Sequence, residues 1–137
     1  INRTDAFLQT ASAALPLNQL HVISADWART SALREMQNLS AEETTEVEAV
    51  ICSNDSMALG VADFYAKQKL PLPVIIGING IQDMQDAIDA GVIYGTVDLN
   101  VPEQAKTIFA IIQGYFDAGA EMPKEKVCYL PQSPYTK

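Results

Sequence analysis

Hydrophobic positions along the chain follow two patterns that alternate from one end to the other. Short runs that are almost wholly apolar predict extended segments at residues 20–24, 47–53, 73–78, 93–98 and 126–130. Between them, apolar residues recur every three to four positions and predict helices at residues 3–15, 29–39, 56–68, 81–90 and 101–116. Each helical segment carries one apolar stripe, which we interpret as the face that packs against a core.

The nearly continuous apolar character of the predicted strands indicates the kind of sheet they form. Such strands are typical of a parallel sheet covered on both faces, whereas a half-exposed antiparallel sheet alternates apolar and polar residues. Right-handed crossovers then give an α/β fold, a doubly wound and mostly parallel sheet. Because the chain opens on a helix, we expect the sheet to lack its first strand and the chain to be the later part of a larger protein. We expect residues 1–137 to form a single domain.

Composition and charge remove several classes of function. With nine Lys and Arg against 17 Asp and Glu, the net charge is −8, which repels phosphate backbones and anionic membranes, so no nucleic-acid partner is expected. No apolar run approaches the about 20 residues that a membrane-spanning helix needs. The first residues also lack the basic and then apolar order of a signal peptide.

Cysteine and histidine usage gives little support for a metal or nucleophilic site. Cys52 and Cys128 lie in apolar, strand-like settings, where they are either reduced and buried or joined as a disulfide between neighbouring strands. His21 is the single histidine, and there is no CxxC pair, so neither a zinc site nor a Cys/His nucleophile is expected. We expect no cofactor and no enzymatic activity, because the GxSxG, P-loop and GxGxxG motifs are absent from the sequence.

Candidate binding residues follow the predicted strands. In open α/β sheets ligands bind beyond the carboxyl ends of the strands, and four of these ends are followed by Trp27, Asn54, Asn79 and Asn100. Arg3 opens the helix that would follow the absent first strand, so all five side chains are expected on one edge of the sheet. An aromatic platform with several amides suits a polyhydroxylated ligand, whose hydroxyls both donate and accept hydrogen bonds.

Purely structural roles compete with binding at these positions. Asp55 or Ser56 is expected to cap the helix that follows, which would leave Asn54 free to face a ligand. Gly77 and Gly80 bracket a tight strand exit that turn geometry alone explains. Asn79 is alternatively a left-handed turn residue, and Trp27 an ordinary aromatic side chain that covers surface.

The residues of several segments resemble those of a known family. The run at residues 52–60, CSNDSMALG, is similar to the xNDxMALG segment of type I periplasmic sugar-binding proteins, the ribose and galactose binders of ABC transporters. Further segments match that family in order: residues 3–7 (RTDAF), 25–27 (ADW), 76–80 (IGING), 87–97 (AIDAGVIYGTV) and 102–104 (PEQ). The resemblance covers nearly the whole chain.

The resemblance implies a two-lobed protein that closes on a sugar, of which this chain is most of the C-terminal lobe. Its partners would be a small sugar-like ligand, the N-terminal lobe of the same protein and an ABC permease. Its location would be periplasmic or extracellular, with a lipoprotein anchor as one form. By position, Arg3 would donate to hydroxyls or the ring oxygen, Trp27 would stack on a sugar face, and Asn54 would donate and accept at hydroxyls.

The sequence departs from the family pattern at three places. Asn79 occupies the position of an aspartate that accepts two hydroxyl hydrogens, and Ile78 replaces an aromatic residue. Asn100 takes the place of a glutamine. Because an amide offers one acceptor oxygen and one donor nitrogen, the hydroxyl pattern recognised should differ from that of the plain aldose binders.

Other classes of protein remain open at this stage. The same fold serves as the effector domain of lac-repressor-type transcription factors and as the ligand-sensing domain of signalling receptors. The AIDAG and GTV stretches within residues 87–97 favour the transporter version. The sequence upstream of Ile1 would discriminate, since a lipobox or signal peptide supports a transporter and a helix-turn-helix supports a repressor.

Overall fold

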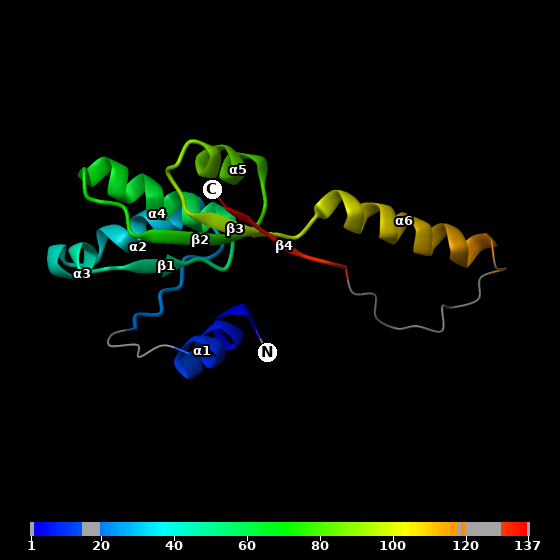
Figure 1. Cartoon of the computed structure of the whole chain (residues 1–137), viewed down its shortest axis with the longest axis horizontal. Helices are drawn as coiled ribbons and strands as arrows, with labels where there is room; N and C mark the ends of the chain where they lie inside the picture. The colour runs from blue at the N-terminus through cyan, green and yellow to red at the C-terminus, as the bar shows by residue number, and fades with distance from the viewer. Residues whose placement is uncertain (1, 15–19, 118, 120–129, 137) are drawn as a thin grey trace.

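A computed structural model describes residues 2–14, 20–117, 119 and 130–136 of the chain (Figure 1). Its elements follow one another in this order: α1 (Arg3–Ala14), α2 (Arg29–Gln37), α3 (Ala41–Thr45), β1 (Ala49–Ile51), α4 (Asp55–Gln68), β2 (Val74–Asn79), α5 (Gln82–Asp89), β3 (Gly95–Asp98), α6 (Val101–Asp117) and β4 (Ser133–Thr136).

The strands form one mostly parallel sheet, which confirms the predicted fold class. Their spatial order is β1-β2-β3-β4, the same as their order in the sequence. The pairs β1/β2 and β2/β3 are parallel, with Val50 opposite Ile75 and Ile78 opposite Val97. β4 pairs with β3 in the antiparallel direction and forms one edge of the sheet. Since the three parallel strands end on the same side, their carboxyl ends share one edge.

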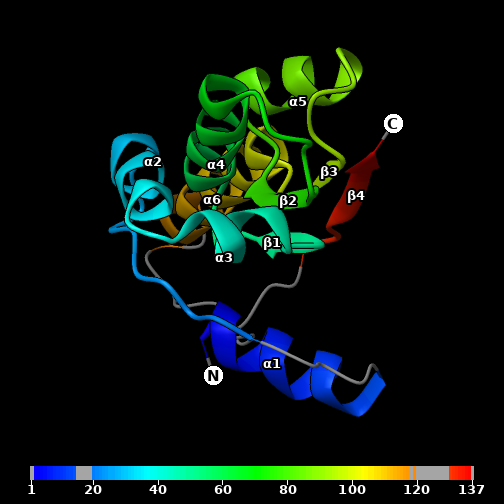
Figure 2. The same cartoon turned by 90° about the vertical axis from the view of Figure 1, so that its left-hand side faces the viewer.

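Helices α4 and α5 cover one face of the sheet, and α2 packs against α4, while α1 lies on the opposite side (Figures 1 and 2). The core lies between α4, α5 and the sheet. Its fully buried side chains include Tyr65 of α4, Ile75 of β2, and Met84 and Ile88 of α5. This arrangement fixes the start of α4 against the ends of β2 and β3.

The close packing of α2 on α4 depends on Gly60. A Cβ atom at this position would collide with the backbone carbonyl oxygen of Arg29, and it would lie 3.0 Å from Cβ of Ala32. A bidentate pair joins the same two helices: Arg29 donates from Nε and Nη2 to the carboxylate of Asp63 at 2.7 and 2.8 Å. The hydrogen bond from Arg29 lowers the pKa of Asp63 below its ordinary value.

The prediction that helix 101–116 buries its apolar stripe in a core is wrong. α6 has no buried residue, and Phe109 and Phe116 are 66% and 71% exposed. The helix leaves the carboxyl end of β3 and runs away from the sheet (Figure 1). Its apolar face therefore finds no packing partner among the described residues. Within the described part of the chain, no helix combines the length and apolar character needed to cross a membrane.

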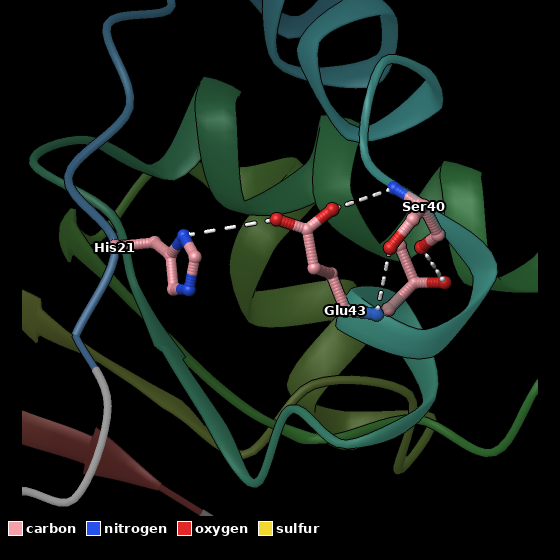
Figure 3. Close-up of polar contacts among 4 residues, drawn as sticks. His21, Ser40 and Glu43 are labelled. Carbon is pink, nitrogen blue, oxygen red and sulfur yellow. Dashed lines mark hydrogen bonds and ion pairs between the residues drawn. The ribbon is translucent and has the colours of Figure 1, made fainter.

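The predicted strand at residues 20–24 is also not formed. Leu20, Val22 and Ile23 are exposed, and no backbone hydrogen bond among the described residues joins this segment to β1. Instead, Nδ1 of His21 lies 4.0 Å from the carboxylate of Glu43, which itself forms a reciprocal capping box with Ser40 at the start of α3 (Figure 3). This apolar run does not become a strand because it forms no backbone hydrogen bonds with a neighbouring strand. Among the described residues, β1 is therefore the edge of the sheet on this side.

The predicted strand at 126–130 falls mostly on residues outside those that the structure describes, and Leu130 is not part of a strand. The last strand comes a few residues later, as β4, and contains Pro134. Proline is compatible with an edge strand, because one backbone N–H can be missing there without breaking a central ladder.

Candidate functional site

The carboxyl edge of the sheet brings the candidate residues to one side of the molecule. β1, β2 and β3 end at Ile51, Asn79 and Asp98, so Asn54 and Asn100 follow directly on two of these ends. The roles of these residues in binding remain a prediction, but their placement at strand ends is as the topology requires.

Trp27 stands at this edge on an unusual backbone. Asp26 and Trp27 both have positive φ angles, of 48° and 61°, and the turn leads directly into α2. Its carbonyl oxygen accepts a hydrogen bond from Nδ2 of Asn54 at 2.9 Å. The indole is 60% exposed although it is large and apolar. A left-handed backbone conformation is energetically unfavourable for residues other than glycine and persists only where the surrounding structure holds it. This turn, with its two left-handed residues, places the Trp27 ring in solvent.

The expectation that Asp55 or Ser56 caps α4 and leaves Asn54 free is wrong. Asn54 is the N-cap: its φ of −151° and ψ of 165° are extended, and Oδ1 accepts a hydrogen bond from the backbone N–H of Met57 at 2.8 Å. Because Nδ2 donates to Trp27, both ends of the amide are engaged, and Asn54 is only 8% exposed. The amide retains one further hydrogen and one further lone pair for a ligand.

Arg3, on α1, contacts Trp27 and the residue that precedes Asn54. Its guanidinium donates to the backbone carbonyl oxygen of Ser53 and lies 5.7 Å from the centre of the Trp27 ring. This is within the range of a cation–π interaction. The structure thus brings Arg3, Trp27 and Asn54 together as one contact group.

Asn79 and Asn100 lie around the end of β3. Asn79 has a φ of 140° and is half-buried, which differs from the left-handed turn conformation considered for it; its carbonyl oxygen accepts from the N–H of Leu99 at 3.2 Å. Asn100 is exposed, with a φ of 51°, and its N–H donates to Oδ1 of Asp98 at 2.7 Å. Among the described residues, no hydrogen bond joins these two amides to Asn54 directly, so they form a second group at the same edge.

Asp55 connects the two groups, a role that the sequence pattern does not predict. Its carboxylate is fully buried and accepts hydrogen bonds from the N–H groups of Gly80 and Ile81 and from the hydroxyl of Thr96. The signal lies in Gly77, where a Cβ atom would collide with Oδ1 of Asp55. Gly77 is therefore required by close packing and not by turn geometry, whereas Gly80, with a φ of 78°, is a turn residue as predicted.

A hollow of about 320 Å³ lies between α1 and the open face of the sheet. Arg3 and Phe7 line it from α1, and Ile51, Cys52 and Ile76 line it from the sheet side. Burial raises the pKa of the Cys52 thiol to about 12, with a smaller contribution from the charge of Asp55. The thiol is therefore protonated and unreactive at neutral pH. Cys128 lies outside the described residues, so the disulfide alternative stays a prediction.

The side chains at this edge are of kinds that form noncovalent contacts. It offers a flat indole, a guanidinium and amides that both donate and accept. Among residues 2–14, 20–117, 119 and 130–136, no three His, Cys, Asp or Glu side chains are grouped so that they could hold a metal ion.

Known proteins are similar to this chain over most of its length. The family model described as the periplasmic binding protein domain matches residues 1–120. The D-allose-binding periplasmic protein of Escherichia coli (strain K12) is 28% identical over 124 residues, which is 90% of this chain and 38% of that protein. The ribose import binding protein RbsB of Salmonella typhimurium (strain LT2) is 33% identical over 96 residues, 70% of this chain and 32% of that protein. The chain thus spans less than half the length of these relatives.

Solved structures show the same fold. The Caulobacter myo-inositol binding protein, bound to myo-inositol, superposes with a TM-score of 0.82 at 24% identity, covering 98% of this chain and 46% of that chain. An ABC transporter solute binding protein of Bacillus halodurans C-125, with bound myo-inositol, gives a TM-score of 0.77 at 25% identity, covering 98% and 45%. The family is one of binding proteins and not of enzymes, which agrees with the prediction from the sequence. The resemblance to type I periplasmic sugar-binding proteins is confirmed, and the chain belongs to the periplasmic binding protein family.

Proposed function

We propose that this chain is most of the C-terminal lobe of a two-lobed solute-binding protein. The whole protein captures a small polyhydroxylated ligand, a monosaccharide or a close relative, by closing its lobes, and it delivers the ligand to an ABC permease. Binding is noncovalent and reversible, because all the groups at the edge act through hydrogen bonds, stacking or charge.

The observation that carries this proposal is the exposed Trp27 ring beside Arg3 and Asn54 at the carboxyl edge of the sheet. An exposed indole offers an apolar face to the C–H groups of a sugar, and the neighbouring polar groups can pair with its hydroxyls. Asn79 and Asn100, at the ends of β2 and β3, extend the same edge and complete the proposed set of ligand-binding residues.

Both the relatives and the departures in this sequence bear on the ligand class. The named ligands of similar proteins, D-allose, ribose and myo-inositol, are all small compounds with several hydroxyls. With an amide at Asn79, one hydroxyl of the ligand accepts from Nδ2 and another donates to Oδ1. We therefore propose a ligand whose hydroxyl pattern differs at this point from that of the ribose and galactose binders.

The remaining parts of the protein follow from the same proposal. The chain covers 38% of its allose-binding relative, which leaves room for an N-terminal lobe that supplies the opposite wall of the site. We place the protein in the periplasm or outside the cell, as the names of the relatives suggest, and propose a lipoprotein anchor as one form of attachment.

Calorimetric titration of the full-length protein with sugars, polyols and nucleosides tests this function. The panel should include D-allose, ribose and myo-inositol. Trp27→Ala should weaken binding of the best ligand by tenfold or more, because the stacking surface is lost. Tyr94→Ala is the matched control, since Tyr94 is a similarly exposed aromatic (58%) that lies just before β3, at the opposite end of the strand.

Two results would contradict the proposal. Silence across the whole panel would exclude polyhydroxylated solutes as the ligand class. Equal affinities for the wild type, Trp27→Ala and Tyr94→Ala would show that a sugar binds but not at the carboxyl edge.

A further inference from the structure

A fully buried carboxylate, that of Asp55, links the start of α4 to the turn after β2 and to a side chain of β3. Asp55 is the first residue of α4, directly after the β1 exit, and it is 0% exposed. Its Oδ2 accepts from the N–H of Gly80 at 2.7 Å and from the N–H of Ile81 at 2.9 Å, just past the end of β2. Its Oδ1 accepts from the hydroxyl of Thr96, in β3, at 2.6 Å.

No cation neutralises this group within the described part of the chain, because none of the ion pairs there includes Asp55. A buried carboxylate is costly unless hydrogen bonds replace its lost hydration. Two backbone N–H groups and one hydroxyl do so here, and the N-terminal end of α4 adds a favourable dipole. The buried carboxylate is therefore stabilised by the backbone N–H groups of the turn after β2, and the same hydrogen bonds hold that turn in place.

The turn that Asp55 holds has a backbone that does not form easily by itself. Asn79 has a φ of 140°, which few residues other than glycine adopt, and Gly80 follows with a φ of 78°. On its other side, the turn packs against Asp98, whose Oδ1 would lie 2.6 Å from a Cβ atom at Gly80. The turn is thus held between Asp55 on one side and Asp98 on the other.

We propose that Asp55 is a positioning residue for ligand recognition: by fixing the Asn79–Gly80 turn, it sets where the Asn79 amide stands relative to Asn54. The inference rests on the proposed function, in which Asn79 and Asn54 contact the same ligand. Asp55 itself contacts no ligand, because it is wholly buried. Asn54 and Asp55 are adjacent in sequence. A displacement of the start of α4 therefore moves Asn54, which contacts Trp27, together with Asp55, which holds the Asn79–Gly80 turn.

Variants of the full-length protein separate positioning from plain stabilisation. Asp55→Ala removes all three hydrogen bonds, whereas Asp55→Asn keeps the shape and one acceptor oxygen. Thr96→Val is the matched control, because it removes the buried hydrogen bond to Oδ1 and leaves both turn N–H groups with their acceptor. Each variant is titrated with the best ligand of the wild type, at temperatures well below its own midpoint of unfolding. Amide NMR signals and hydrogen exchange of Gly80 and Ile81 are measured in the same samples.

We expect Asp55→Ala to weaken binding by tenfold or more and Asp55→Asn by a smaller factor, with faster exchange at Gly80 and Ile81 in both. Thr96→Val should lower the melting temperature but change affinity by less than threefold. Wild-type affinity in Asp55→Ala would overturn the inference, as would affinity losses that simply follow the losses in melting temperature across the three variants.

The experiment still gives an answer if one variant does not fold or if the wild type binds no compound of the panel. If Asp55→Ala does not fold, Asp55→Asn and Thr96→Val still decide the question through the same two readouts. If the wild type binds nothing in the panel, the proposed function fails, and unchanged Gly80 and Ile81 amide signals in Asp55→Asn would separately show that the carboxylate does not fix the turn.

Discussion

Asn54 uses one side-chain amide for two structural tasks at once. It caps α4 through Oδ1 and holds the Trp27 carbonyl through Nδ2. Asn54 is only 8% exposed and both contacts are partly shielded from water, so solvent replaces them incompletely when the side chain is removed.

Asn54→Ala should therefore destabilise the fold. We expect a loss of about 1 to 3 kcal/mol in the free energy of unfolding, from the missing cap and the unpaired carbonyl. Urea denaturation followed by circular dichroism measures it. Asn54→Asp keeps an acceptor for the Met57 N–H but cannot donate to Trp27, so it should fall between wild type and Asn54→Ala. No loss in either variant would contradict the double role.

At the scale of single residues, the sequence predicts which residues lie at the carboxyl edge of the sheet but not the structural role of each. The positions of Asn54 and Asn79 at strand ends could be identified because parallel topology puts these ends together, whereas Trp27 reaches the edge on a turn and not on the strand predicted before it. Which of two neighbouring residues caps the helix could not, because Asn54 and Asp55 are equally good caps and only tertiary contacts decide between them. The buried role of Asp55 depends on Gly80 and Thr96, which are distant in sequence.

At the scale of elements, two glycines lie in opposite settings: Gly60 in the close contact of α2 with α4, and Gly114 in α6, which packs on no other described element. Gly60→Ala places a methyl group against the carbonyl of Arg29 and should destabilise the fold by about 1 to 3 kcal/mol, despite the better helix propensity of alanine. Gly114→Ala in α6 meets nothing within 4 Å and should stabilise that helix by up to about 1 kcal/mol. Thermal unfolding of both variants tests this, and a stabilised Gly60→Ala would contradict the close packing.

The Arg29–Asp63 pair predicts a pH dependence at the same interface. Since Arg29 lowers the pKa of Asp63, the pair stabilises the fold above the ordinary pKa of 3.8, and this contribution is lost as the pH falls through the lower pKa of the folded state. Both side chains are more than a third exposed, so the contribution is at most about 1 kcal/mol.

Comparison of wild type and Asp63→Asn by urea denaturation between pH 7 and pH 2 measures that contribution. The difference in unfolding free energy should be largest near neutrality and shrink below pH 4. Glu48→Gln removes an exposed acid outside the pair and is the control. A wild-type advantage that stays constant down to pH 2 would contradict the ion pair.

Helices and strands could be predicted from the sequence where the residues of an apolar pattern also pack in the core. The helices α2, α4 and α5 and the strands β1 to β3 fall within or close to the predicted segments, because their apolar residues meet a shared core. Residues 20–24 have a strand-like pattern but no ladder partner. β4 has the partner but, with the sequence Ser-Pro-Tyr-Thr, lacks the pattern. A strand forms only when two segments pair through backbone hydrogen bonds, whereas a hydrophobic pattern describes a single segment.

For the whole molecule, the contrast between a packed core and α6, which has no packing partner among the described residues, predicts uneven local stability. An isolated helix of this length is marginal in water, whereas opening α4 requires breaking the core. Hydrogen exchange measured by mass spectrometry should therefore show fast exchange throughout α6 and slow exchange in α4. Protection of α6 equal to that of α4 would show instead that its apolar face is covered in solution.

The spatial order of the strands repeats their order along the chain, and this has a consequence for synthesis. Each new strand and helix leaving the ribosome finds its neighbour already made, since β1, β2 and β3 pair successively. The paired residues lie 25 positions apart for Ala49 and Val74 and 19 for Ile76 and Gly95, so each parallel pairing forms only after the helix between the two strands has been made. Only β4 must return past α6 to reach β3, so the growing chain can hold a nearly complete sheet before its last edge closes.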